Sequence, residues 1–271
     1  MAVLIHIEDP LDERLAPFRL RERALNTRAD RRERVAAGLF VAEGDLVVER
    51  ALAAGCVPVT AFVDAENPPR VMQRFGADVT VYGGGPEVRT TGMGLGVALS
   101  IVALFRRPAP VDAQSVAAGR RVVALEAVDN PVNVGTVTRS AAALGWDGLL
   151  LDRTSADPLS RRALRVAMGT TFALPFARVA SLVEAIDAAR TAGTLVVGLT
   201  PQREATPLDG VLPRVRQRVM LVVGSERSGL SDAALGACSM TACIPMAAGV
   251  DSMNAAAAVA VACYALRPRR D

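Results

Sequence analysis

The side chains that could do chemistry lie in four polar turns, each of which follows an apolar run. The turns are Asp129–Arg139 (DNPVNVGTVTR), Leu199–Glu204 (LTPQRE), Gly224–Asp232 (GSERSGLSD) and Ile244–Asn254 (IPMAAGVDSMN). They contain asparagine, glutamate, serine and arginine, which can hold a substrate in place and stabilise developing charge. Ligands of open α/β sheets bind beyond the carboxyl ends of the strands, so these turns predict one shared site.

Each turn taken alone also has a purely structural explanation. The glycines of GSERSG can serve only to allow positive φ angles. Ser252 fits the N-cap of a final helix in which Asn254 is the second residue. Arg139 on an amphipathic helix is equally consistent with a solvated side chain or an ion-pair partner. A functional interpretation therefore depends on the turns in combination.

The composition argues against several kinds of site. The four cysteines have no CxxC spacing and His6 is the only histidine, which argues against a zinc site and against Cys–His or Ser–His pairs. We therefore predict no metal. All 31 basic residues are arginine, whose planar fork suits phosphate, although genomic base composition could by itself produce this choice. The net charge of +3 permits an anionic partner without demanding one.

The sequence shows no sign of a membrane segment. No charged-then-apolar leader precedes a cleavage site. The longest strongly apolar stretch, Ala255–Leu266, is too short and too rich in alanine to span a bilayer. The scattered cysteines suit a reducing compartment. We expect a cytoplasmic protein that makes no membrane contact.

Strands and helices are expected to alternate, which indicates an α/β fold with a mostly parallel sheet. A small α/β unit begins at FVAEGDLVVERALAAG and ends with the apolar run VALSIVALF. The next stretch is rich in proline and lacks periodicity. We predict an N-terminal domain over residues 1–105, a linker over 106–119 and a C-terminal domain over 120–271.

The elements expected in the second domain follow from its apolar runs. The candidate strands are Val122–Val128, Gly148–Asp152, Phe176–Val179, Thr194–Thr200, Val219–Gly224 and Ala242–Met246. The candidate helices are Asn133–Leu144, Leu182–Ala192, Ser231–Gly236 and Ser252–Leu266.

The turns together resemble the SpoU (TrmH-like) RNA methyltransferases of the SPOUT superfamily. The family has an Asn-x-Gly turn followed by arginine, then Gly-Ser-Glu-x-x-Gly-Leu, then Ile-Pro-Met followed by Ser-Leu-Asn. The matching residues are Asn133, Gly135 and Arg139; Gly224, Ser225, Glu226, Gly229 and Leu230; and Ile244, Pro245, Met246, Ser252 and Asn254. Met253 stands where leucine is usual, a change that conserves volume. The resemblance extends from about residue 20 to 266 and includes FVAEGDLVVERAL in the N-terminal domain.

This resemblance implies the fold and the activity together. It implies an α/β fold with a C-terminal α/β-knot (SPOUT, deep trefoil knot) methyltransferase domain and a small N-terminal α/β domain, similar to a ribosomal protein, that binds the substrate. It further implies a homodimer, S-adenosylmethionine as cofactor and methyl transfer to a ribose 2′-hydroxyl of structured RNA. The N-terminal domain favours 23S rRNA. Transfer RNA as substrate and a non-catalytic RNA-binding protein remain alternatives. A nicotinamide-dependent oxidoreductase is disfavoured because the first turn lacks GxGxxG.

The resemblance also implies roles for individual residues. The cofactor-binding residues are Leu199, Thr200, Gly224, Ile244 and Met253. The catalytic residues are Arg139, Asn133, Glu226, Ser252 and Asn254. Glycine at position 224 is expected to allow close approach of the cofactor. We expect a charged Arg139 to grip an RNA phosphate and stabilise the developing alkoxide, while a role as base stays open. The other four residues would orient Arg139 or the ribose, and Glu226 is a natural partner for an arginine.

Arginines outside the turns are expected to contact RNA phosphates. They are Arg19, Arg21, Arg23, Arg28, Arg31, Arg32 and Arg165. A solvated amphipathic helix is the alternative for the arginine-rich segment. Arg165 and Gly169 match a family segment that usually reads Arg-x-Ser-x-Gly-Ala, but Ala167 replaces the serine, so we predict no hydroxyl contact there. Aromatic residues are scarce, which favours recognition of RNA shape and backbone over base stacking.

Overall fold

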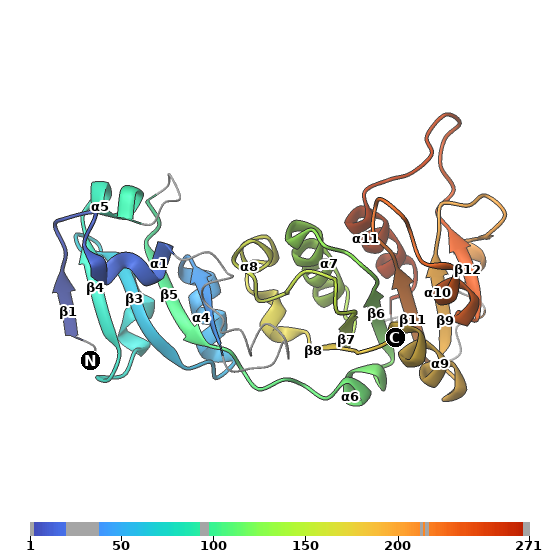
Figure 1. Cartoon of the computed structure of the whole chain (residues 1–271), viewed down its shortest axis with the longest axis horizontal. Helices are drawn as coiled ribbons and strands as arrows, with labels where there is room; N and C mark the ends of the chain where they lie inside the picture. Colours follow the sequence, from blue (N-terminus) through green and yellow to red (C-terminus); the bar gives the residue numbers. More distant parts are fainter. Residues whose placement is uncertain (1–2, 20–37, 93–97, 212–213, 215–216, 268–271) are drawn as a thin grey trace. The chain divides into compact units, whose positions relative to one another are not determined.

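The computed structural model describes residues 3–19, 38–92, 98–211, 214 and 217–267 of the chain. The chain forms two compact units, one of Met1–Pro110 with Leu159–Phe172 and the other of Val111–Pro158 with Ala173–Asp271. The segment Leu159–Phe172 thus groups with the first unit, although it lies within 120–271 in the sequence. Each unit contains one sheet (Figure 1).

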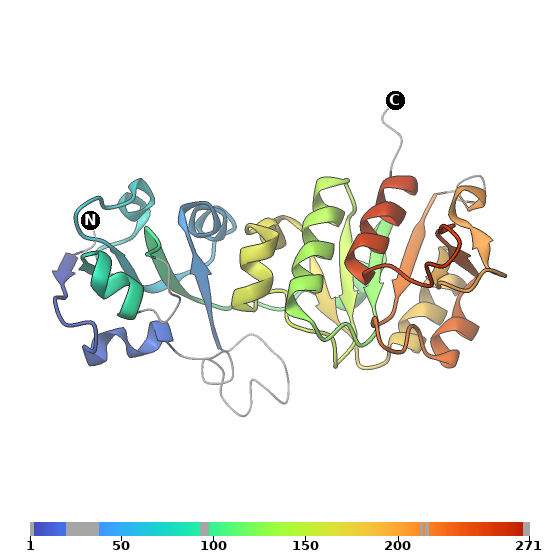
Figure 2. The ribbon, with the colours of Figure 1, turned by 90° about the horizontal axis from the view of Figure 1, so that it is seen from above.

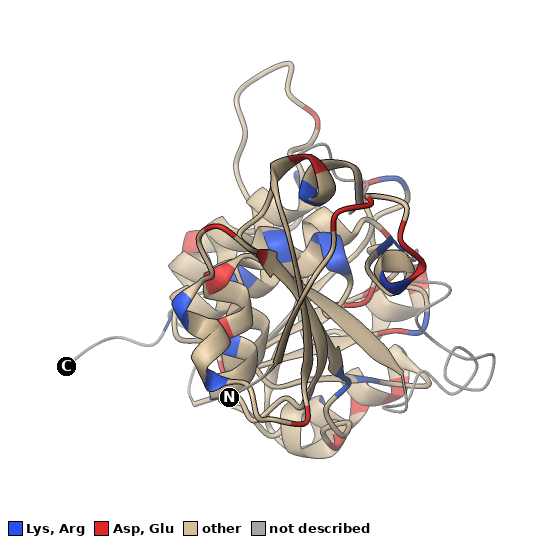
Figure 3. Cartoon of the chain, turned by 90° about the vertical axis from the view of Figure 1, so that its left-hand side faces the viewer, with Lys and Arg blue, Asp and Glu red and all other residues tan. Residues whose placement is uncertain are grey.

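The first unit is built on a five-stranded sheet in the order β1-β4-β3-β5-β2. Its strands are β1 (Val3–His6), β2 (Leu39–Glu43), β3 (Pro58–Asp64), β4 (Thr80–Gly84) and β5 (Ile101–Arg106). Its helical elements are η1 (Glu13–Leu15), α1 (Ala16–Arg19), α4 (Asp45–Ala53), η2 (Arg70–Arg74), α5 (Pro86–Gly92) and α8 (Arg161–Ala167). β4 is parallel to β1 and β3, whereas β5 is antiparallel to β3 and β2. Acidic and basic residues are interspersed over the described elements (Figure 3).

Aromatic packing explains part of the cohesion of the first unit. Phe18 packs on Phe62 with ring centroids 6.1 Å apart. Phe40 stacks on Phe105 at 5.4 Å, and Phe172, which follows α8, packs on Phe40 at 5.6 Å. Such aromatic pairs add to the free energy gained by burying their apolar area. They join the segment after α8 to the first sheet.

The end of α8 also contacts α4. Nη1 of Arg50 donates to the carbonyl oxygen of Met168 at 2.6 Å. Gly169 has a φ of +76°, and a Cβ at this position would lie 3.3 Å from Cα of Val47. Only glycine adopts this backbone conformation without strain, and the close approach of α4 leaves little room for a side chain. Gly169, which matches the family segment, therefore has a structural function in the first unit.

The second unit is built on a seven-stranded sheet in the order β10-β12-β9-β11-β6-β7-β8, and the pairings that the structure describes in it are all parallel. Its strands are β6 (Arg121–Leu125), β7 (Gly148–Leu151), β8 (Phe176–Arg178), β9 (Leu195–Leu199), β10 (Thr206–Pro207), β11 (Val219–Val223) and β12 (Met240–Cys243). Its helices are α6 (Ala113–Ala117), α7 (Pro131–Ala143), α9 (Leu182–Thr191), η4 (Leu208–Gly210), α10 (Asp232–Ala237) and α11 (Ala255–Ala265). The short helix η3 (Thr170–Ala173) spans the boundary between the units.

Helices cover both faces of this parallel sheet, which accounts for its continuously apolar strands. Val123 and Leu125 of β6 belong to the core under α7 and α11, whereas Val122 and Ala124 belong to the core under α6, α9 and α10. Helices α7 and α11 lie side by side (Figure 2). The second unit is therefore a three-layer α/β/α structure.

The predicted α/β class with a parallel sheet is confirmed, and each strand predicted for residues 120–271 is present with its ends shifted by a few residues. The stretch predicted as a linker contains the helix α6, which Asp112 caps by accepting the N–H of Ser115 at 2.8 Å. Elements β1, α5, α8 and β10 were not predicted. They are short and lack a clear periodic pattern.

The prediction for the start of the last helix was wrong. Its N-cap is Asn254 rather than Ser252, because Oδ1 of Asn254 accepts the backbone N–H of Ala257 at 3.1 Å. Serine and asparagine are about equally good N-caps, so residue preference could not decide between them. Asn254 consequently lies at the helix terminus, where its amide group can reach neighbouring loops.

Candidate active site

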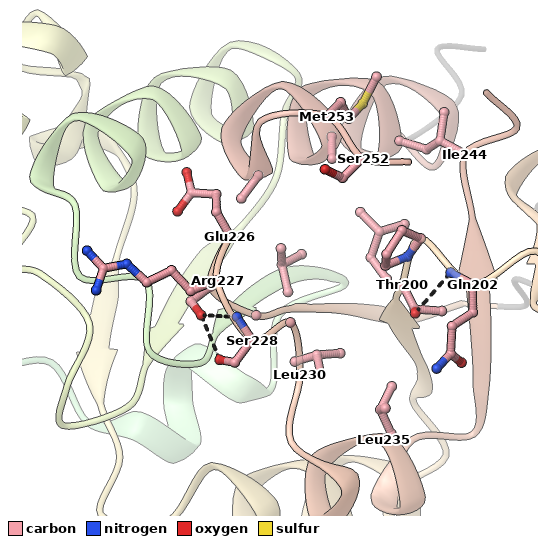
Figure 4. Close-up of a pocket in the computed structure, with 18 of the residues that line it drawn as sticks. Thr200, Gln202, Glu226, Arg227, Ser228, Leu230, Leu235, Ile244, Ser252 and Met253 are labelled. Carbon is pink, nitrogen blue, oxygen red and sulfur yellow. Dashed lines mark hydrogen bonds between the residues drawn. The ribbon is translucent and has the colours of Figure 1, made fainter. Parts of the chain in front are cut away.

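A pocket of about 470 Å³ lies at the carboxyl edge of the second sheet. The adjacent strands β12, β9 and β11 end at this edge, and residues from the loops 199–202, 223–230 and 244–253 line the pocket. In Figure 4, Glu226 and Arg227 lie on one side of the pocket, with Thr200 and Gln202 on the opposite side. A parallel sheet brings the carboxyl ends of its strands to one edge, so loops far apart in sequence meet here.

The residues predicted to bind the cofactor all line this pocket. They are Leu199, Thr200, Gly224, Ile244 and Met253. Glu226 and Ser252, which were predicted as catalytic, line it as well. The wall thus combines apolar side chains with hydroxyl and carboxylate groups, a mixture typical of small-molecule sites.

Gly224 is required by the fold of its own loop. A Cβ at this position would lie 2.1 Å from the carbonyl carbon of Gly229 and 2.4 Å from the amide nitrogen of Leu230. The loop folds back on itself, and Gly229, with a φ of +68°, donates its N–H to the carbonyl oxygen of Ser225 at 2.9 Å. Gly224 was expected to allow close approach of a cofactor. The structure supplies a stricter reason, because the loop backbone already occupies the space.

Asn133, Glu226 and Asn254 form a hydrogen-bonded cluster beside the pocket. Nδ2 of Asn133 donates to Oε1 of Glu226. Nδ2 of Asn254 lies 3.2 Å from both Oε1 of Glu226 and Oδ1 of Asn133. The cluster ties the start of α7, the loop after β11 and the start of α11 together. Both donors to the carboxylate are neutral amides, so they fix its orientation without adding a counter-charge.

Arg139 is more exposed than Asn133, which lies on the same helix. It is on α7, about two helical turns beyond Asn133. Its side chain is exposed, whereas that of Asn133 is buried. Arg139 does not belong to the residues that line the pocket. Four of the five predicted catalytic residues therefore meet at or beside the pocket, and the fifth does not.

The arginines predicted to contact RNA fall into two groups. Five of them lie outside the described residues: Arg21, Arg23, Arg28, Arg31 and Arg32. Arg19 ends α1 and donates from its guanidinium to the carbonyl oxygen of Pro10. Arg165 lies on α8 and donates from Nε to Oε2 of Glu43 at 2.8 Å. Both described arginines are thus held by acceptors within the first unit.

Several pocket residues were not predicted. They are Gln202, Arg227, Ser228 and Asp232, and each lies in a turn that the sequence had already marked. Glu126, just after β6, accepts the backbone N–H and the hydroxyl of Ser231, both at 2.8 Å. This contact anchors the end of the loop after β11. No residue pattern around Glu126 indicated it, because its partner lies far away in sequence.

The thiol of Cys238, which follows α10, is a partly buried hydrogen-bond donor. Sγ of Cys238 donates to the carbonyl oxygen of Ala234 at 3.1 Å. Burial, with a smaller contribution from the carboxylate of Glu126, raises the pKa of the Cys238 thiol to about 11. A thiol with this pKa is protonated at neutral pH and is a poor nucleophile.

The described residues contain no group of three or more His, Cys, Asp or Glu side chains placed to hold a metal ion. Within the same part of the chain, no helix has the length and apolarity needed to cross a membrane.

Comparison with known sequences identifies close relatives. The model of the SpoU rRNA Methylase family matches residues 120–264. An uncharacterized tRNA/rRNA methyltransferase of Mycobacterium bovis is 36% identical over 261 residues, which cover 94% of this chain and 89% of the relative. A 23S rRNA (uridine(2479)-2′-O)-methyltransferase of Streptomyces viridochromogenes is 39% identical over 144 residues, which cover 52% of this chain and 50% of the relative.

Solved structures resemble the chain along nearly its whole length. An AdoMet-bound rRNA methyltransferase from Sinorhizobium meliloti has a TM-score of 0.79 and 25% identity, covering 97% of each chain. The SpoU methyltransferase AviRb from Streptomyces viridochromogenes, in complex with AdoMet, has a TM-score of 0.76 and 25% identity, covering 94% of this chain and 97% of that one. The family model spans more than half of the chain and agrees with these similarities. The chain therefore belongs to the SpoU rRNA methylase family of methyltransferases, as its turns predicted.

Proposed function

We propose that this chain transfers a methyl group from S-adenosylmethionine to a ribose 2′-hydroxyl of structured RNA, with 23S rRNA as the substrate. The observation that carries the proposal is the pocket at the ends of β9, β11 and β12, where the five expected cofactor residues meet. Membership of the SpoU family supports methyl transfer. The Streptomyces viridochromogenes relative, named for 2′-O-methylation of 23S rRNA, supports the ribose and the type of RNA.

The pocket suits S-adenosylmethionine in size and chemistry. Its volume of about 470 Å³ lies within the range of roughly 300–1,000 Å³ that is usual for small-molecule sites. Leu199, Leu235 and Ile244 offer apolar surface to a nucleobase, and Thr200 and Gln202 offer polar groups. When bound, the cofactor supplies an electrophilic methyl group on a sulfonium. AdoMet in two solved relatives supports this assignment.

The amide–carboxylate cluster holds the geometry of the site. Asn254 caps α11 with Oδ1 and holds Glu226 with Nδ2, so one side chain sets both the start of the helix and the direction of the carboxylate. We assign Asn133 and Asn254 to positioning, and Glu226 and Ser252 to contact with the ribose. Orientation in a closed site lowers barriers by roughly 7–11 kcal/mol. A positioned base typically raises the rate about 10²–10⁴-fold, which corresponds to a smaller reduction of roughly 3–5 kcal/mol.

Arg139 is proposed to act in the site of the partner subunit of a homodimer. Its side chain is exposed on α7. Val132 on α7, and Val261 and Tyr264 on the adjacent α11, are exposed apolar side chains. A second copy would cover this surface in a symmetric dimer. Arg139 then grips a phosphate and stabilises the developing alkoxide.

The remaining proposals follow from the family resemblance. The second unit forms the knotted methyltransferase domain, and the first unit forms an RNA-binding domain. The arginine-rich segment and Arg165 contact RNA phosphates. The protein acts in the cytoplasm.

Replacing Arg139 by alanine tests the catalytic proposal. We expect Arg139→Ala to lower methyl transfer to RNA by at least about 10²-fold, because the developing alkoxide loses its charged partner. Affinity for S-adenosylmethionine should change little, because Arg139 lies outside the pocket lining. Transfer of labelled methyl groups to unmodified ribosomal and transfer RNA measures the first effect, and calorimetry measures the second. Arg190→Ala, at an exposed ion pair on α9, is the matched control.

Three outcomes would contradict parts of this account. Undiminished turnover in Arg139→Ala would remove the role of Arg139. Labelling of transfer RNA but not of ribosomal RNA would contradict 23S rRNA as the substrate. Binding of NAD without binding of S-adenosylmethionine or S-adenosylhomocysteine would overturn the proposed activity.

Mixing two inactive variants separates a shared active site from a self-contained one. Arg139→Ala keeps an intact pocket, and Glu226→Ala keeps an intact Arg139. If Arg139 acts across a dimer, random mixing restores about a quarter of wild-type activity, since half of the dimers are mixed and each has one complete site. No recovery would place Arg139 and Glu226 in the same subunit's site. A fully active protein that is monomeric by light scattering would contradict the proposed homodimer.

A further inference from the structure

Glu43 is a buried carboxylate that the proposed chemistry does not use. It ends β2, and its side chain is 3% exposed. Two arginines of α8 pair with it. Nε of Arg161 donates to Oε1, and Nε of Arg165 donates to Oε2 at 2.8 Å. Residues four positions apart lie on one face of a helix, so α8 presents both guanidinium groups to a single carboxylate.

The two arginines are held in different environments. The Arg161 side chain is 14% exposed, and its Nη1 also donates to the carbonyl oxygen of Phe18 at 3.1 Å. The Arg165 side chain is 53% exposed, with Nη2 lying 2.5 Å from Oε2 of Glu43. Arg161 is thus an internal anchor of α8, whereas Arg165 is bound to Glu43 on one edge and reached by solvent on the rest.

The geometry of the guanidinium determines what Arg165 can still bind. The group has five N–H donors in a rigid plane, and its Nε–Nη2 edge faces Glu43. The Nη1 end therefore points away from the carboxylate. Two arginines and one glutamate leave a formal charge of +1 on the cluster. An exposed, oriented guanidinium with excess positive charge is suited to an RNA phosphate.

We propose that Glu43 is a positioning residue for RNA binding, which holds Arg165 so that its outer N–H groups meet a substrate phosphate. Arg161 balances the buried charge in the fold. An arginine that is already held loses less rotamer freedom on binding than a free one. This inference rests on the proposed function, in which Arg165 contacts RNA. Glu43, the glutamate of FVAEG, then contributes to substrate recognition in addition to the stability of the fold.

A double-mutant cycle tests whether Glu43 acts through Arg165. The affinity for unmodified 23S rRNA transcribed in vitro is measured for wild type, Glu43→Gln, Arg165→Ala and the double variant. Arg165→Ala should weaken binding by roughly tenfold and reduce the slope of log K against log salt concentration by about one. Glu43→Gln should weaken binding in the wild-type background but little further in Arg165→Ala. Additive losses, or wild-type affinity in Glu43→Gln, would overturn the proposal.

Further variants keep the test decisive if Glu43→Gln does not fold. Arg165→Lys keeps the charge but has no planar fork for the carboxylate to orient. We expect Arg165→Lys to lose most of the affinity that Arg165→Ala loses, and full affinity would overturn the proposal. Arg162→Ala is the matched control, since Arg162 is an exposed arginine of the same helix. Any loss that it causes should add to that of Glu43→Gln.

Two wild-type measurements separate this inference from the proposed function. Calorimetry with S-adenosylmethionine and labelling of 23S rRNA are done first. A wild type that fails both overturns the proposed function. A wild type that passes both but shows an additive cycle overturns the role of Glu43 alone. In a folded Glu43→Gln variant we expect the KM for RNA to rise while the KM for S-adenosylmethionine stays unchanged, a split that a purely structural role would not produce.

Discussion

Two glutamates, one in each unit, are held in opposite ways. Glu43 is buried and accepts hydrogen bonds from two arginines. Glu226 is exposed at the pocket and accepts hydrogen bonds from the amides of two asparagines. A buried carboxylate needs charged partners to offset the cost of leaving water, whereas water still reaches Glu226. The charge of Glu43 is thus balanced by arginines inside the first unit, whereas Glu226 keeps a solvent-exposed carboxylate at the pocket.

The largest expected effect on stability comes from removing Glu43. Glu43→Ala should lower the free energy of unfolding by roughly 3–5 kcal/mol, because Arg161 would remain largely buried without its carboxylate. Denaturant unfolding followed by circular dichroism measures the change. Glu49→Ala, at an exposed glutamate of α4, is the control and should stay within about 0.5 kcal/mol of wild type. A loss in Glu43→Ala no larger than that of the control would contradict the contrast between the two glutamates.

Asn254 gives an intermediate effect because it belongs to both a helix cap and the site. Asn254→Ala should cost about 1 kcal/mol of stability through loss of the N-cap. Asn254→Asp keeps a good cap but places a second carboxylate beside Glu226. We therefore expect near wild-type stability and strongly reduced methyl transfer in Asn254→Asp. Equal activity of Asn254→Asp and wild type would show that the amide donor is not needed.

The smallest effect on stability is expected at Glu226. Glu226→Gln should change the free energy of unfolding by no more than about 0.5 kcal/mol, because the side-chain oxygen can still accept from the buried amide of Asn133 and the exposed amide of Asn254 can bond to water. Methyl transfer should nevertheless fall by about 10²-fold. Parallel unfolding and activity assays give both numbers. A destabilisation as large as that of Glu43→Ala would mean that both carboxylates stabilise the fold to the same extent.

The sequence predicted the second sheet and the pocket residues well for a physical reason. Strands covered on both faces read as continuous apolar runs, and the turns after them are marked by glycine and proline. Gly224 and Ile244 follow such runs directly, so their placement at one sheet edge follows from the topology of parallel strands. The apolar runs and the turn residues that mark these strand ends can both be recognised from neighbouring positions in the sequence.

The contacts that escaped prediction are long-range. Nothing in the neighbourhood of Glu43 indicates that α8, more than a hundred residues later, supplies its two arginines. For Glu226 the sequence suggested an arginine as a natural partner, whereas the structure gives it two asparagine amides. Residue types restrict which partners are chemically suitable, but only the folded chain selects among those that are suitable.

The segment Leu159–Phe172 has a consequence for how members of this family can be recombined. Because it leaves one unit and packs in the other, the chain passes between the units at three places, after Pro110, Pro158 and Phe172. A chimera joined once, near residue 110, would pair Glu43 of one parent with the α8 of another. A working exchange must move Leu159–Phe172 together with the N-terminal part. The part that must be exchanged is thus discontinuous in the sequence. A chimera that exchanged only the N-terminal part would have to form the Glu43 contacts with the α8 of the other parent.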